Sequence, residues 1–197
     1  MKIIMIDKNG CFVIKYKRID RNQQKGQSMD REQRLKDLYS SIYSRPGLAR
    51  ALDVIGKAMT ALVALSFACA VGLLVYTGDY LGAVKLSVLA GIPFVIVSLM
   101  RELIDCNRPY EVIECDALSD MVSARKKGHS FPSRHVFSAF IIGTLWMILS
   151  PYVGTATLLF GAVIAISRVL LGIHFVRDVV VGAVIGIVSG VIGILIW

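Results

Sequence analysis

Long stretches without charged residues alternate with short polar connections along most of the chain. A helix of about 20 residues, rising 1.5 Å per residue, crosses roughly 30 Å of hydrocarbon. The second stretch contains only Lys85, and a turn at Ser150–Pro151 divides the third from the fourth. The pattern predicts five membrane-spanning helices, at residues 58–78, 80–100, 135–150, 151–168 and 179–197.

Glycines recur at every fourth position in the last of these helices, at Gly182, Gly186 and Gly190. Such a stripe lies on one helix face and lets a second helix approach closely. We expect the stripe to pack inside the same bundle, in preference to forming a homodimer face. The sequence leaves the oligomeric state open.

The composition agrees with a membrane protein. Of the 197 residues, 55% are hydrophobic and 18% are charged, which is far more apolar than an ordinary soluble domain. Four scattered cysteines form no CxxC pair, which excludes a zinc site and a disulfide-dense extracellular scaffold. We therefore predict an all-α fold, a polytopic bundle in the cell membrane.

Positive charge is concentrated at the amino-terminal end. The net charge is +8, and 12 of the 22 Lys and Arg residues lie within residues 1–50. We expect residues 1–50 to form a basic tail with an interfacial helix near residues 35–50, and residues 51–197 to form the membrane domain. An unstructured segment is an equal alternative for residues 1–30. The positive-inside rule favours a cytoplasmic tail, and we expect no nucleic-acid partner.

The remaining polar residues gather in two connections, residues 101–133 and 168–178. With five spans, both connections emerge on the same side of the bilayer and can form one site. Arg101 and Arg108 are seven positions apart, so we expect both on one helix face until Pro109 ends the helix.

Ser133, Arg134 and His135 open the third predicted span. Ser133 is a suitable N-cap, and free backbone N–H groups with the helix dipole would attract a phosphate. The second connection reads Ser167-Arg168-x5-His174-x3-Asp178.

This set is typical of phosphoryl transfer through a histidine. His174, oriented by Asp178, would attack phosphorus, the arginines would stabilise the oxygens, and His135 would protonate the leaving group. No metal or cofactor is needed. Taken singly, each residue also fits an interfacial anchor or a simple ion pair. His129, in a basic loop, is assigned either to solvent or to a substrate headgroup.

Three motifs resemble the type 2 phosphatidic acid phosphatase family, the lipid-phosphatase branch of the superfamily shared with vanadium haloperoxidases. The family pattern is Lys-x6-Arg-Pro, then Pro-Ser-Gly-His, then Ser-Arg-x5-His-x3-Asp. The sequence has Arg101-x6-Arg108-Pro109, Pro132-Ser133-Arg134-His135 and the third motif unchanged. The resemblance covers roughly residues 55–197 and implies the phosphatase fold.

The resemblance implies that His174 becomes phosphohistidine, that Asp178 orients it, and that His135 is the general acid that later activates water. It implies phosphate binding by four further residues, Arg101, Arg108, Ser133 and Arg168. Two positions depart from the family: Arg101 replaces Lys, which keeps the charge, and Arg134 replaces Gly. We interpret Arg134 as an added phosphate-binding cation suited to a diphosphate.

The expected function is a metal-independent lipid phosphatase acting on phosphatidic acid, phosphatidylglycerol phosphate or polyprenyl diphosphate (undecaprenyl diphosphate included). The expected partners are this lipid phosphate and the membrane, and the parity of the spans places the site on the cytoplasmic side. The alternative is a non-catalytic lipid-binding or transport protein that retains the anion site, although binding alone would not need His174 with Asp178. A haloperoxidase is disfavoured by the membrane location.

Overall fold

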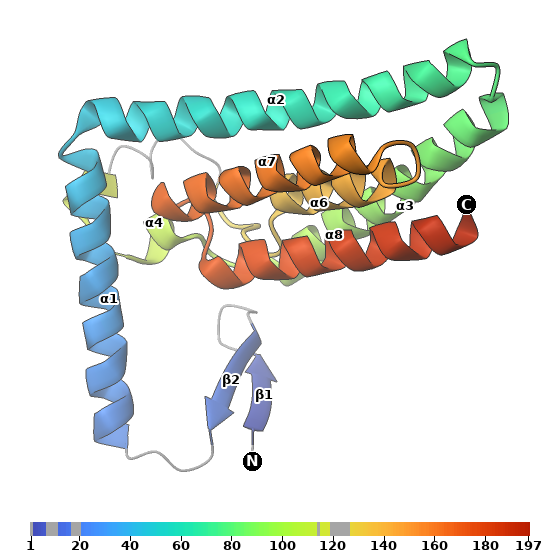
Figure 1. The fold of residues 1–197 in the computed structure, drawn as a ribbon. Coiled ribbons are helices and arrows are strands. Elements are labelled where there is room, and N and C mark those ends of the chain that lie inside the picture. The colour runs from blue at the N-terminus through green and yellow to red at the C-terminus, as the bar shows by residue number, and fades with distance from the viewer. Residues whose placement is uncertain (1, 7–11, 17–20, 114, 119–126) are drawn as a thin grey trace.

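The computed structural model describes residues 2–6, 12–16, 21–113, 115–118 and 127–197. Five helices run side by side in a bundle, and a further helix, α1, stands across one end of it (Figure 1). The bundle helices are α2 (Pro46–Tyr76), α3 (Tyr80–Ile104), α6 (Arg134–Trp146), α7 (Pro151–Leu170) and α8 (Val176–Ile196). The prediction of an all-helical membrane bundle is confirmed, and one bundle helix overlaps each of the five predicted spans.

Four of these helices, α2, α3, α7 and α8, are long and apolar enough to cross a membrane, so the chain is a multi-pass membrane protein. The fifth, α6, has 13 residues and lies in the middle of the bundle, packed mainly against α8 and α7. Its residues Val136, Phe137 and Ala139 are completely buried. Because α6 faces protein on most sides, it has little apolar surface left for lipid.

The glycine stripe of α8 faces α6. A Cβ atom at Gly182 would lie 2.7 Å from the carbonyl oxygen of Ser133, and one at Gly186 would lie 2.7 Å from that of Phe137. These contacts confirm that the stripe packs inside the bundle. The close approach brings the start of α6 against the start of α8, where the second and third motifs lie.

The amino-terminal region contains more regular structure than expected. Strands β1 (Lys2–Ile6) and β2 (Phe12–Tyr16) form an antiparallel hairpin with Ile4 opposite Ile14, and α1 covers Arg21–Tyr43. The hairpin has no counterpart among the predicted elements, and the helix begins and ends earlier than the predicted range, residues 35–50. The basic and amide residues of this segment are good helix formers, so an exposed helix can extend through them.

The first bundle helix also begins earlier than the uncharged stretch. Helix α2 starts at Pro46, not near residue 58, and its 31 residues span about 46 Å at 1.5 Å per residue. Its charged first turns include an ion pair of 2.6 Å between Asp53 and Lys57, one helical turn apart. Hydropathy marks only the part of a helix that lipid surrounds, whereas the helix itself continues beyond the hydrocarbon.

Helix α1 contacts the end of the bundle that carries the polar connections. Tyr39 is buried in an apolar cluster with Tyr110, Leu118 and Leu171, and the Tyr43 hydroxyl donates to the carbonyl of Leu171 at 3.1 Å. The cluster also joins the short helices α4 (Pro109–Val112) and η1 (Asp116–Leu118). The basic amino-terminal helix and both polar connections therefore lie at the same end of the molecule.

Candidate active site

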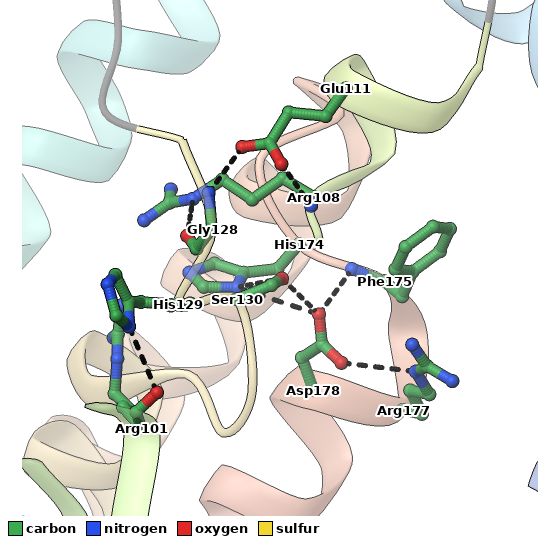
Figure 2. Close-up of polar contacts among 10 residues, drawn as sticks. All are labelled: Arg101, Arg108, Glu111, Gly128, His129, Ser130, His174, Phe175, Arg177 and Asp178. Atoms are coloured by element: carbon green, nitrogen blue, oxygen red, sulfur yellow. Dashed lines mark hydrogen bonds and ion pairs between the residues drawn. The ribbon is translucent and has the colours of Figure 1, made fainter. Parts of the chain in front are cut away.

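The two polar connections meet, as the parity of the spans predicts. The amide N–H of Ser133 donates to the carbonyl of Asp178 at 3.0 Å, and that of Tyr110 donates to the carbonyl of Gly172 at 3.3 Å. Side chains from both connections point toward one another in Figure 2. Segments about 40 or more positions apart in the sequence thus form one polar cluster.

The third motif surrounds the turn between α7 and α8. Arg168 is in the last turn of α7, and Gly172 adopts a φ of +67°, which reverses the chain and favours glycine. Asp178, in the first turn of α8, accepts from the amide N–H of Phe175 at 3.0 Å and so caps the helix.

His174 lies in the turn before α8, two residues ahead of its first residue, Val176. The turn nevertheless brings the imidazole Nδ1 within 3.8 Å of Asp178 Oδ2. His174 is only 2% exposed. Burial lowers the pKa of His174, and the nearby Asp178 carboxylate opposes this effect. The neutral imidazole, which is the nucleophilic form, is thereby favoured.

Ser130 is a site residue that the sequence analysis missed. Its hydroxyl is fully buried, donates to Asp178 Oδ2 at 2.5 Å and lies 3.3 Å from His174 Nδ1 (Figure 2). Only its position three residues before Ser133 could have drawn attention to it. It contacts both residues that are expected to form the nucleophile and its orienting carboxylate.

The first motif is arranged differently from the prediction. Helix α3 ends at Ile104, with Asp105 in a left-handed conformation (φ 38°), so Arg101 and Arg108 do not share a helix face. They still converge, because both donate hydrogen bonds to one loop. Arg101 Nη2 donates to the carbonyl of His129, and Arg108 Nε donates to the carbonyl of Gly128 at 3.0 Å.

The loop that these arginines hold is also fixed from the other side. Glu111 Oε1 accepts from the amide N–H of Gly128 at 2.7 Å. The His129 ring donates from Nδ1 to the carbonyl of Arg101 at 3.1 Å and lies 3.4 Å from Asp105 Oδ1. His129 thus bonds the end of α3 instead of extending freely into solvent, although its side chain is 45% exposed.

The second motif begins α6. Ser133 occupies the N-cap position as predicted, but its side chain makes no capping hydrogen bond. The Ser133 hydroxyl is buried and has no hydrogen-bond partner among the residues that the structure describes. A buried hydroxyl without a partner costs free energy, which is consistent with a ligand that supplies one.

Arg134 and His135 are exposed and line a cavity of about 510 Å³ between α2, α3 and α6. The rest of its lining is mostly apolar and includes Val63, Phe67 and Phe94. The cavity therefore has a cationic end, at Arg134, and a larger hydrophobic part.

Four predicted phosphate-binding arginines lie near the two histidines. His135 lies within electrostatic range of His174 and of three arginines, Arg101, Arg134 and Arg168, and Arg108 acts on His174 in the same way. Ser167 is buried beside α2, and its hydroxyl donates to the carbonyl of Ile164 in its own helix.

Within the described ranges, no group of three or more His, Cys, Asp or Glu residues is suited to a metal ion. Metal independence stays a prediction.

Comparison with known proteins places this arrangement in a family. No curated protein sequence matches the chain. Two crystal structures are similar to it in fold. Aquifex aeolicus LpxE is 23% identical, with 81% of this chain and 93% of that chain covered and a TM-score of 0.55. The first transmembrane PAP2 type phosphatidylglycerolphosphate phosphatase from Bacillus subtilis is 20% identical, with 84% and 85% covered and a TM-score of 0.59. The family model of the PAP2 superfamily matches residues 79–197, which include all three motifs, and the chain therefore belongs to the PAP2 superfamily.

Proposed function

We propose that the protein is a lipid phosphatase that hydrolyses a phosphomonoester or diphosphate lipid through a phosphohistidine on His174. The observation that carries this proposal is the position of His174, which lies near a serine hydroxyl and a carboxylate and also near several guanidinium groups. Its Nδ1 faces Ser130 and Asp178, which leaves Nε2 as the ring nitrogen that can attack. The surrounding guanidinium groups suit the oxygens of a phosphoryl group.

The first step forms a bond from Nε2 of His174 to phosphorus and breaks the bond from phosphorus to the leaving oxygen. His135 donates a proton to that oxygen, so the leaving group departs neutral or with one charge fewer. Arg101, Arg108 and Arg168, with the amide N–H groups at the start of α6, stabilise the non-bridging oxygens.

In the second step, His135 removes a proton from water, and the resulting oxygen attacks phosphorus. The bond from His174 to phosphorus then breaks and inorganic phosphate is released. For a phosphomonoester the leaving group of the first step is a lipid alcohol, and for a diphosphate it is a lipid monophosphate. Both histidines return to their starting protonation states, so each turnover consumes only water.

The apolar cavity beside His135 supports a lipid as the substrate. Its cationic end would hold the phosphate, while the hydrophobic body would hold the first part of the tail. The name of the Bacillus subtilis neighbour supports phosphatidylglycerol phosphate as one substrate to test. Phosphatidic acid and a polyprenyl diphosphate have the same combination of charge and tail.

Arg134 supports a preference for diphosphates. It lines the cavity beside His135 and is exposed, so its guanidinium is available for a second phosphoryl group. We expect Arg134→Gly to weaken hydrolysis of a polyprenyl diphosphate more than hydrolysis of phosphatidic acid. Equal rates for both lipids before and after the substitution would contradict this role.

Phosphate release by the detergent-purified protein tests the activity. The three lipids are supplied separately with EDTA present, beside His174→Ala. Denaturation at alkaline pH within the first turnover traps the phosphoenzyme, because phosphohistidine is stable in base and labile in acid. Release that survives EDTA and disappears in the variant supports the mechanism. Loss of activity in EDTA would refute metal independence, and binding without release from any lipid would favour the lipid-binding alternative.

The side of the membrane is a separate part of the proposal. The basic tail and the site lie at the same end of the bundle, so the positive-inside rule assigns both to the cytoplasm. Lys127 is exposed at this end. We expect Lys127→Cys to resist a membrane-impermeant thiol reagent in intact cells and to react after permeabilisation. Labelling of intact cells would place the site outside.

A further inference from the structure

Ser130 occupies the space between the two groups that set the chemistry of the nucleophile. The shortest contact between His174 Nδ1 and Asp178 Oδ2 is 3.8 Å, which is too long for a hydrogen bond. The Ser130 hydroxyl lies 3.3 Å from the nitrogen and 2.5 Å from the oxygen. It therefore bridges a gap that the imidazole and the carboxylate leave open (Figure 2).

The direction of the bridge follows from its donors and acceptors. A serine hydroxyl has one proton, and an ionised carboxylate can only accept. The shorter contact assigns the Ser130 proton to Asp178 Oδ2. The hydroxyl oxygen then accepts from His174, so Nδ1 carries the ring proton and Nε2 carries the free electron pair.

The backbone holds Ser130 in this place. Its amide N–H donates to the carbonyl of Cys106 at 2.8 Å. The two preceding residues, Gly128 and His129, have their carbonyls bonded to Arg108 and Arg101, respectively. The segment that carries the bridging hydroxyl is thus fixed by the same arginines that surround the proposed phosphate site.

We propose that Ser130 is a positioning residue, which selects the Nδ1–H tautomer of His174 by joining the imidazole to Asp178. This inference rests on the proposed function of His174 as the nucleophile. Ser130 itself is fully buried and is assigned no contact with the substrate. It acts on the reaction only through the orientation and tautomer of His174.

The test compares Ser130→Ala, Ser130→Thr and a matched control in the full-length chain in detergent. Ser66→Ala is the control, because its hydroxyl donates to a carbonyl of its own helix, Val63 O at 2.8 Å, and Ser66 is not among the residues that line the cavity. Steady-state kinetics give kcat and KM. Nitrogen-15 NMR of ring-labelled histidine reports the tautomer of His174, and thermal unfolding verifies that each variant is folded.

We expect Ser130→Ala to lower kcat about 10- to 100-fold with KM changed less than about twofold, since one buried hydrogen bond is lost without a substrate contact. The His174 ring signals should move away from the Nδ1–H tautomer. Ser130→Thr, which keeps the hydroxyl, should restore the tautomer and part of kcat, and Ser66→Ala should resemble the unmodified protein.

An unchanged tautomer in a folded Ser130→Ala variant would overturn the inference, whatever its activity. A large increase in KM with kcat preserved would also overturn it, because Ser130 would then bind substrate. The NMR measurement does not need turnover. If the unmodified protein hydrolyses no lipid while the tautomer depends on Ser130, the proposed function fails and the positioning role of Ser130 survives.

Discussion

Replacing Gly186 by alanine should destabilise the bundle, because at this glycine α8 packs closely against the backbone of α6. The added Cβ would lie 2.7 Å from the carbonyl oxygen of Phe137, 2.9 Å from Cβ of Phe140 and 3.1 Å from the amide nitrogen of Ile141. Two of these three atoms belong to the backbone of a buried helix. Rotation of a flexible side chain cannot relieve such contacts, so the helices must separate.

The magnitude follows from two opposing terms. Overpacking of a tightly packed core typically costs about 1–3 kcal/mol. Alanine regains up to about 1 kcal/mol through its higher helix propensity. Because two of the contacts are with backbone that cannot move aside, the cost should lie in the upper part of that range, about 2–3 kcal/mol, and the net loss is then about 1–2 kcal/mol. For a chain of this size each kcal/mol lowers the unfolding midpoint by roughly 2–4 °C. We therefore expect a decrease of about 2–8 °C.

The assay is thermal unfolding of the purified protein in detergent, followed by the loss of monodisperse protein. Gly72→Ala is the matched control, because it also replaces a glycine inside a membrane helix, but a Cβ there meets no atom within 4 Å. Its midpoint should stay the same or rise. If Gly186→Ala and Gly72→Ala have the same midpoint, the close contact of α8 with α6 is not present in the protein.

Three further predictions concern the site. His135→Asn should lower kcat by about 10²- to 10⁴-fold, as loss of a general acid does, with the unfolding midpoint retained. Because burial lowers the pKa of His174, its neutral form persists as the pH falls below the ordinary value of about 6.5. The acid limb of phosphoenzyme formation should therefore lie below that value, and a limb above it would contradict the burial argument. Tyr43→Phe removes the bond to the carbonyl of Leu171, so it should lower the unfolding free energy by about 0.5–1.5 kcal/mol in denaturant titration.

The main outline of the fold could be predicted because lipid imposes a simple requirement. Every apolar stretch long enough to cross the hydrocarbon must satisfy its backbone internally, so it forms a helix. This reasoning finds α2, α3, α7 and α8 directly. It overestimates α6, since a helix surrounded by protein needs no full span, and it overlooks the β1–β2 hairpin, whose segment has no comparable hydropathy signal.

The polar cluster was predictable to the extent that spacing determines position. The His174 and Asp178 spacing brings two side chains together across a single turn. The same reasoning fails for Arg101 and Arg108, because α3 ends between them. The loop after α3 has no regular repeat, so spacing in the sequence does not determine where its side chains lie. They converge because both bond to carbonyls of the 128–130 segment, which is a tertiary contact.

The support of the site extends beyond the family match at residues 79–197. Helix α1 precedes this region, yet Tyr39 packs against the turn that leads to His174, where a Cβ at Gly172 would lie 3.4 Å from the Tyr39 ring. The connections that carry the motifs contain irregular backbone, which hydrocarbon would not tolerate without partners. Together with α4 and η1, helix α1 buries the apolar side chains of these connections at the end of the bundle. In the proposed mechanism, water would reach the phosphoryl group at this end while the lipid tail stays in the cavity between α2, α3 and α6. We expect a bundle without α1 to hold this arrangement less rigidly.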